Sequence, residues 1–194
     1  MAPRTDGPFD SPPHCGSLRR FYAALGVVVL LVLLGAWLQA PLRVWYWENA
    51  VRRACAASEK PNPEDPRGFP PIRRSARVLA AIGPRAGPAL DRLLQDHELS
   101  NSEWILWGIG DADAVWALPM VVRETRNGYY DIAATALMVA GTLARREFIG
   151  EKDFYDAKNT DDGKNLYKIV GPGQERLREW WEREGLAKYG GTEK

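Results

Sequence analysis

This chain of 194 residues has very few of the side chains that most often carry enzyme chemistry. It contains 2 cysteines and 2 histidines. The cysteines, Cys15 and Cys55, encode no disulfide framework, and a zinc or iron site built on histidines is excluded because His97 is the one histidine beyond residue 40. We therefore expect no metal ion and no other cofactor.

Other signatures of catalysis are missing as well. The sequence has no glycine-rich phosphate loop with a neighbouring Lys-Ser or Lys-Thr, and no Gly-x-Ser-x-Gly elbow. Asp111 and Asp113 form a carboxylate pair, but acidic residues are common at helix starts, which favours a structural role. Beyond residue 40 Lys and Arg equal Asp and Glu in number, so no basic excess neutralises phosphates. Enzyme and nucleic-acid-binding classes are both disfavoured.

One uncharged run stands apart from the rest of the chain. Residues 21–40 carry no charged side chain, and a helix of this length covers about 30 Å, the thickness of the hydrocarbon core of a bilayer. Because Gly26 to Leu34 is apolar on every face, a transmembrane helix is favoured over a buried core helix. The run is long for a cleaved signal peptide, and Pro41 follows directly, which favours an uncleaved signal anchor.

The flanks of this run predict the topology. The numbers of Lys and Arg on the two flanks do not decide the orientation, but Arg19 and Arg20 stand at the very edge of the run. We therefore expect the tail 1–20, which is rich in Pro and Gly and expected to be disordered, to stay in the cytoplasm. We expect a single-pass protein of the cytoplasmic (inner) membrane with its C-terminal domain outside. Trp37, Trp45, Tyr46 and Trp47 fit an aromatic belt at the far interface, although Trp45 to Trp47 fit the start of a packed helix equally well.

Beyond the anchor the hydrophobic periodicity predicts helices and no strands, so the fold class is all-α. Residues 41–71 combine a helix expected over 44–58 with a proline-rich linker from Pro61 to Pro71. A domain is expected over 72–185, followed by a C-terminal tail over 186–194. Its third part has a helix over 129–144, an insertion over 147–173 and a delayed partner helix over 174–184.

Two stretches of this domain, Leu79 to Gly83 and Leu106 to Gly110, are imperfect copies of one pattern. Each precedes a proline at a helix start, Pro88 or Pro119. The two glycines are 27 residues apart and the two prolines 31, which predicts one extra helical turn around Asp111 to Ala114. Pro119 either opens a short helix or kinks a longer one.

The first copy carries a family resemblance. Its residues resemble the consensus of bacterial HEAT-like repeats, the group that includes the phycocyanobilin-lyase type: Ala76, Leu79, Ile82, Gly83, Pro84, Pro88, Ala89, Leu90, Leu93 and Leu94. The segment 150–156 and the helix with Trp180 and Trp181 resemble the element that closes such stacks. The resemblance implies a short α-solenoid of two to three HEAT-like hairpins.

Helical repeats of this kind are scaffolds by default. We therefore expect a non-catalytic, membrane-tethered scaffold that contacts lipid through residues 21–40 and binds a protein of unknown identity or a second copy of itself. The alternative is an enzyme or assembly factor like the bilin lyases, which would bind a small ligand. Aromatic residues are the candidate protein-binding residues, although the tryptophans fit a core-filling role as well: Trp104, Trp107, Trp116, Phe154 and Tyr155.

Overall fold

The computed structural model describes residues 15–58, 71–96, 101–159 and 165–190. Within these ranges all regular structure is helical, as predicted. The tail 1–14, the linker 59–70, His97 and residues 191–194 lie outside the described residues, and so do the side chains of Cys15 and Trp37. The chain forms two compact units, Met1–Gln39 and Ala40–Lys194.

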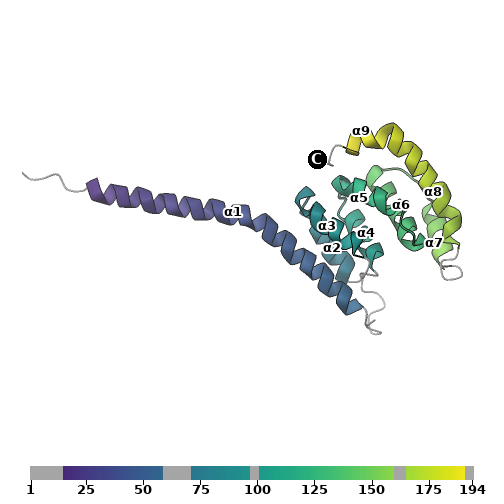
Figure 1. Ribbon diagram of the computed structural model, residues 1–194, viewed down its shortest axis with the longest axis horizontal. Coiled ribbons are helices and arrows are strands. Elements are labelled where there is room, and N and C mark those ends of the chain that lie inside the picture. The colour runs from purple at the N-terminus through teal and green to yellow at the C-terminus, as the bar shows by residue number, and fades with distance from the viewer. Residues whose placement is uncertain (1–14, 59–70, 97–100, 160–164, 191–194) are drawn as a thin grey trace, which may run out of the picture. The chain divides into compact units, whose positions relative to one another are not determined.

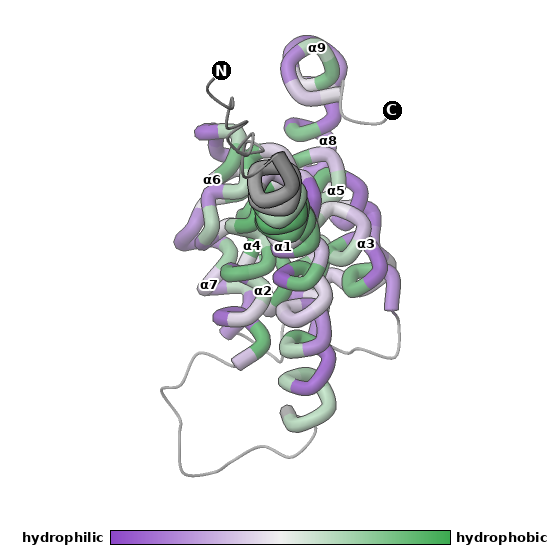
Figure 2. The backbone as a smooth tube through the Cα atoms, turned by 90° about the vertical axis from the view of Figure 1, so that its left-hand side faces the viewer, coloured by the Kyte–Doolittle hydropathy of each residue, from purple (hydrophilic) through white to green (hydrophobic). Residues whose placement is uncertain are grey.

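The first unit consists of the apolar part of helix α1 (Cys15–Ser58). Every residue from Tyr22 to Gly35 is exposed, and Val27 to Leu34 present large aliphatic side chains to the surroundings. This helix is long and apolar enough to cross a membrane. Figure 2 shows the hydrophobic residues along its successive turns.

The C-terminal part of α1 belongs to the core of the second unit. The helix expected over 44–58 continues directly from the apolar run, as predicted. Val51 and Cys55 are 0% and 2% exposed, and Val44 and Trp47 are half-buried against the same hydrophobic cluster. The core therefore extends beyond the range 72–185 that was expected for the domain.

Ion pairs fix this part of α1 to helix α3 (Gly87–Gln95) and the residue after it. The Arg92 guanidinium donates to both Glu48 carboxylate oxygens, at 2.6 and 3.1 Å, and Arg52 donates to Asp96 at 2.7 Å. Burial opposes ionisation of Glu48, but the hydrogen bonds and charges of Arg92 and Arg52 outweigh it and lower the pKa of this carboxyl. Burial, with the nearby Asp96 charge, raises the pKa of the Cys55 thiol to about 11.

The remaining helices of the second unit pack in a regular succession. Helix α2 (Pro71–Ala81) packs on α4 (Ser102–Asp111), α4 on α6 (Tyr130–Ala144), and α6 on α8 (Leu166–Trp180). The shorter helices α3 and α5 (Leu118–Glu124) contact α4 and α6 respectively. Figure 1 shows these helices following one another along the domain.

A short 3₁₀ turn followed by an α-helix occurs twice, at an interval of 31 residues. Pro84–Ala86 leads into α3, and Val115–Ala117 leads into α5. Pro88 and Pro119 each stand in the first turn of the α-helix, where the missing proline N–H costs no hydrogen bond. Pro119 therefore opens a short helix, which was one of the two predicted alternatives.

The predicted extra turn around Asp111 to Ala114 is wrong. The residue with a left-handed backbone after α2 is Gly83, with φ 97°, and its counterpart after α4 is Asp113, with φ 48°. Gly110 lies inside α4 and does not end it. The interval from Gly83 to Asp113 is thus 30 residues, close to the 31 between the two prolines. The interval of 27 residues in the sequence pattern came from matching Gly83 to Gly110, which lies inside a helix.

The third part of the domain differs from the predicted insertion. Residues 151–159 form helix α7 (Glu151–Asn159), and α8 begins at Leu166 rather than at Gln174, with Pro172 inside the helix. Gly173 allows α8 to pass close to its neighbours, because a Cβ there would lie 2.5 Å from Ile149 Cγ2 and 2.9 Å from Leu137 Cδ1. The Gly-Pro-Gly sequence therefore marks close packing and not a helix start.

The chain remains helical beyond α8. A π-helical segment (Trp181–Gly185) leads into α9 (Leu186–Tyr189), so the first residues of the predicted C-terminal tail are ordered. Trp180 is 4% exposed, and its ring contacts those of Phe148, Trp181 and Tyr189, with centroid distances of 5.4, 5.9 and 6.2 Å.

Candidate interaction site

The three tryptophans predicted to bind a partner do not share one exposed surface. Trp104, Trp107 and Trp116 are all half-buried and pack against the core. The Trp116 ring lies against the start of α3, 3.5 Å from the position that a Cβ would take at Gly87. The core-filling alternative accounts for these positions at least in part.

Helix α7 covers one side of Trp107. Phe154, also a candidate binding residue, is only 1% exposed, and its ring meets Trp107 edge to face with centroids 6.1 Å apart. The Arg73 guanidinium stacks 5.4 Å from the centre of the Trp107 ring. Lys158 of α7 forms an ion pair with Glu103 of α4. The insertion thus closes over this tryptophan instead of leaving it free.

Four exposed tyrosines occur in this region of the domain. Tyr155, the fifth candidate, is 46% exposed. Tyr129, Tyr130 and Tyr167 were not predicted, and they are 70%, 57% and 53% exposed. The centroids of the Tyr130 and Tyr167 rings are 6.4 Å apart, although Tyr130 belongs to α6 and Tyr167 to α8.

A surface cavity of about 410 Å³ lies beside these rings. Its lining comes from four elements, α4, the start of α6, α7 and α8. We call this cavity and the exposed Tyr167 ring beside it the tyrosine cleft, and the lining residues are Glu103, Gly128, Tyr129, Tyr130, Asp131, Lys158 and Leu166.

The local sequence explains why this edge is well defined. Asn127 turns the chain before α6, and its side-chain oxygen accepts the backbone N–H of Tyr129 at 3.1 Å. The carboxylate of Asp131 accepts the N–H of Ile132 at 2.8 Å, in the first turn where negative charge is favoured. The two adjacent tyrosines are therefore held at a fixed helix start.

The chemistry of the tyrosine cleft suits binding. Its phenol rings offer apolar area and a hydroxyl at low conformational cost, and the Glu103 and Lys158 charges neutralise each other at its base. Among the described residues, no group of three or more His, Cys, Asp and Glu side chains could hold a metal ion. The arrangement can accept apolar or hydrogen-bonding side chains of another molecule.

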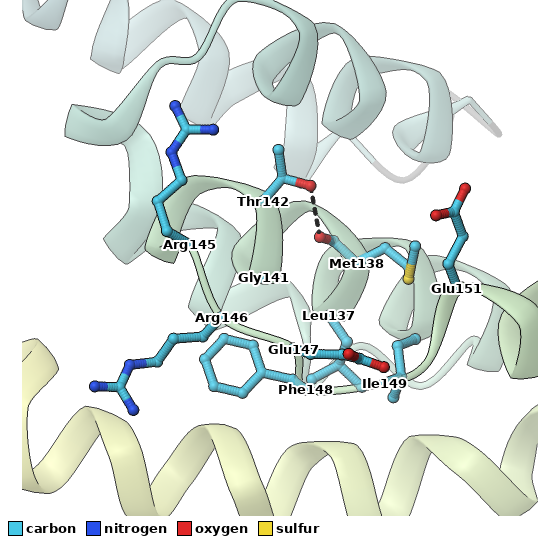
Figure 3. Close-up of a pocket in the computed structure, with 10 residues that line it drawn as sticks. All are labelled: Leu137, Met138, Gly141, Thr142, Arg145, Arg146, Glu147, Phe148, Ile149 and Glu151. Carbon is cyan, nitrogen blue, oxygen red and sulfur yellow. Dashed lines mark hydrogen bonds between the residues drawn. The ribbon is translucent and has the colours of Figure 1, made fainter.

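Two further cavities are lined by arginine and glutamate residues among others. One, of about 380 Å³, lies between the end of α6 and the segment before α7, and its lining includes Met138, Ile149 and two arginines, Arg145 and Arg146 (Figure 3). The other, of about 470 Å³, lies between α5 and α8 and is crossed by a hydrogen bond from Gln174 to the Thr125 carbonyl at 2.5 Å.

Comparison with known proteins gives no relative. No protein family, no curated protein and no solved structure matches this chain. The function must therefore be argued from the residues themselves.

The sequence contains a signal for part of the tyrosine cleft. Gly128-Tyr129-Tyr130-Asp131 places two aromatic residues at the boundary of a turn and a helix, where side chains are often exposed. Tyr167 carries no such signal, because only the packing of α8 on α6 brings it beside Tyr130.

Proposed function

We propose that this chain is a single-pass membrane protein whose helical domain belongs to the HEAT-like repeats and binds a protein partner without catalysis. The membrane attachment is supported by α1, in which residues 22–35 are exposed and apolar. The HEAT-like assignment is supported by the 31-residue recurrence of the 3₁₀ turn and proline-started helix. The orientation with the domain outside the cytoplasmic membrane rests on Arg19 and Arg20.

The observation that carries the binding function is the tyrosine cleft. Tyrosines anchor protein interfaces because they bury a large rigid area and keep a hydrogen-bonding hydroxyl. The tyrosine cleft brings together three tyrosines that are each more than half exposed, Tyr129, Tyr130 and Tyr167. Exposed aromatic rings lower the solubility of a protein, and a domain that served only as a tether or spacer would gain nothing from them.

The test compares two variants of the full chain in its native membranes. In Tyr130→Ala with Tyr167→Ala the anchors are removed, and interface anchors of this type cost about 2 kcal/mol each, or roughly 30-fold in affinity. The matched control is Leu186→Ala, an exposed apolar residue of α9 at 53% exposure. We expect one stoichiometric partner after mild crosslinking, lost from the tyrosine variant and kept in the control.

Trp107→Ala is not suitable for this test, because Trp107 also packs on Phe154 and Arg73. Capture of the same proteins by the wild type and both variants would contradict the binding function. A reporter fused to the C-terminus tests the orientation separately, since activity of a cytoplasm-specific reporter would reverse it.

A further inference from the structure

The segment of α1 from Leu42 to Arg53 has two distinct faces. With 3.6 residues per turn, residues 42, 45, 46, 49 and 53 lie on one side of the helix, and residues 44, 47 and 51 on the other. The second face packs into the domain, where Val51 is fully buried. On the first face Leu42, Trp45 and Tyr46 are 59%, 62% and 58% exposed.

The exposed face changes its chemistry within one helical turn. Leu42, Trp45 and Tyr46 are apolar or amphipathic, whereas Asn49 and Arg53, which follow them on the same face, are polar. Asn49 donates to the Trp45 carbonyl at 2.8 Å. Within the described helix, the border between apolar and polar surface thus falls between Tyr46 and Asn49.

We propose that Leu42, Trp45 and Tyr46 form a lipid-binding face that seats the helical domain directly on the bilayer surface. This inference rests on the membrane attachment proposed above. In a helix, Trp45 lies about 8 Å beyond Ala40, which is close to the depth of one headgroup layer. Tryptophan and tyrosine are the residues that favour this layer, because their rings are apolar at one end and polar at the other.

Lipid is the occupant that the surrounding residues favour. Leu42, Trp45 and Tyr46 follow the exposed apolar residues 22–35 in the same helix, α1. Arg43 is exposed beside it and suits the phosphates of the headgroups. Since the opposite face of the same helical turns carries core residues, the lipid-binding face is part of the domain and not of a flexible tether.

The proposal is tested by spin labels on the full chain in nanodiscs of phosphatidylcholine and phosphatidylglycerol. Single cysteines replace the native residue in Trp45→Cys, Tyr46→Cys and Arg53→Cys, in a Cys15→Ser background. Cys55 is retained because it is 2% exposed. Leu30→Cys reports on the apolar part of α1. Collision rates with oxygen and with a water-soluble nickel complex measure the depth of each label.

We expect the spin labels at 45 and 46 to collide less often with the nickel complex, and more often with oxygen, than the label at 53 does. The label at 53 should show the collision rates of a water-exposed site. Water-like values at 45 and 46 with a lipid-like value at 30 would overturn the lipid-binding face alone. A water-like value at 30 would overturn the membrane attachment itself. Labels at 45 and 46 that neither probe reaches, with spin-spin broadening between copies, would overturn the proposal in favour of a self-association face.

Discussion

Two helices of this chain are apolar on almost every side, yet their surroundings are opposite. In α1 the residues Val27 to Leu34 are exposed, whereas α6 is buried along most of its length. The difference lies in the size of the side chains. α6 carries alanine at several of its buried positions, and these small side chains let α4, α5 and α8 pack closely around it. The apolar run of α1 has bulky valines and leucines that fit lipid chains better than close helix packing.

The comparison also corrects a general expectation. Apolar residues on every face of Gly26 to Leu34 favoured a transmembrane helix over a buried core helix. The second unit nevertheless buries most of α6, an apolar helix of 15 residues. Length and side-chain size therefore separate the two kinds of apolar helix better than apolar periodicity does.

The largest effect is expected when the same substitution is made in both helices. Leu137 of α6 is fully buried, and Leu137→Ala should lower the free energy of unfolding by about 3 kcal/mol, because it leaves a cavity. Leu31 of α1 is 59% exposed, so Leu31→Ala should leave the stability of the domain unchanged. Urea unfolding of the full chain in detergent, followed by tryptophan fluorescence, measures both. Equal losses of unfolding free energy in the two variants would contradict the difference in surroundings between α1 and α6.

The second prediction concerns close helix packing within the domain. A Cβ at Gly108 would lie 2.7 Å from Ala76 Cβ and 2.8 Å from the backbone of Arg73 and Arg77. Gly108→Ala should therefore destabilise the domain by about 2 kcal/mol through overpacking. Gly110→Ala in the same helix is the matched control, since its nearest contact is 3.4 Å away at Val139.

At Gly110 the better helix propensity of alanine should instead stabilise the domain, by up to about 1 kcal/mol. The thermal midpoints of the two variants should thus move in opposite directions. If Gly108→Ala also raised the midpoint, α2 and α4 would not approach each other as closely as described.

The smallest effect is expected at the ion pair that fixes the C-terminal part of α1. Glu48→Gln should cost about 1 kcal/mol at neutral pH, because Arg92 and Arg52 lose a charged partner. The folded state lowers the pKa of Glu48 from its ordinary value of 4.5. Its stabilisation is therefore complete above pH 4.5 and is lost as the pH falls through the lower folded value.

The stability gap between wild type and Glu48→Gln should close below pH 4.5, and unfolding curves at pH 7 and pH 3 measure it. The exposed Glu147 provides the control, since Glu147→Gln at a surface position should change the free energy of unfolding by no more than about 0.5 kcal/mol at pH 7. A gap that stayed constant with pH would mean that the ion pair does not hold α1 to the domain.

The helices that sequence predicted well are those with strong local signals. The apolar period of α6 gave its bounds to within one residue, and Pro88 marked the first turn of α3. These signals act within a few residues of the chain, so no knowledge of the packing is needed.

The residues that could not be predicted depend on contacts between distant segments. The helical path through Gly171-Pro172-Gly173 depends on the packing of Gly173 against Ile149 and Leu137. The meeting of Tyr130 and Tyr167 likewise depends on the way α8 returns to α6. Phe154 was a candidate binding residue because it is aromatic, but α7 turns it toward Trp107.

The left-handed residues after α2, α4 and α6 have a consequence for protein design. All three residues have a positive φ, which Gly83 adopts freely and which Asp113 and Arg145 adopt at a steric cost. Their side chains form an ion pair with each other at 2.7 Å, but both are largely exposed, so the pair offsets little of that cost. An idealised array built from this domain would carry glycine at all three helix ends and could then be extended by copying a single unit.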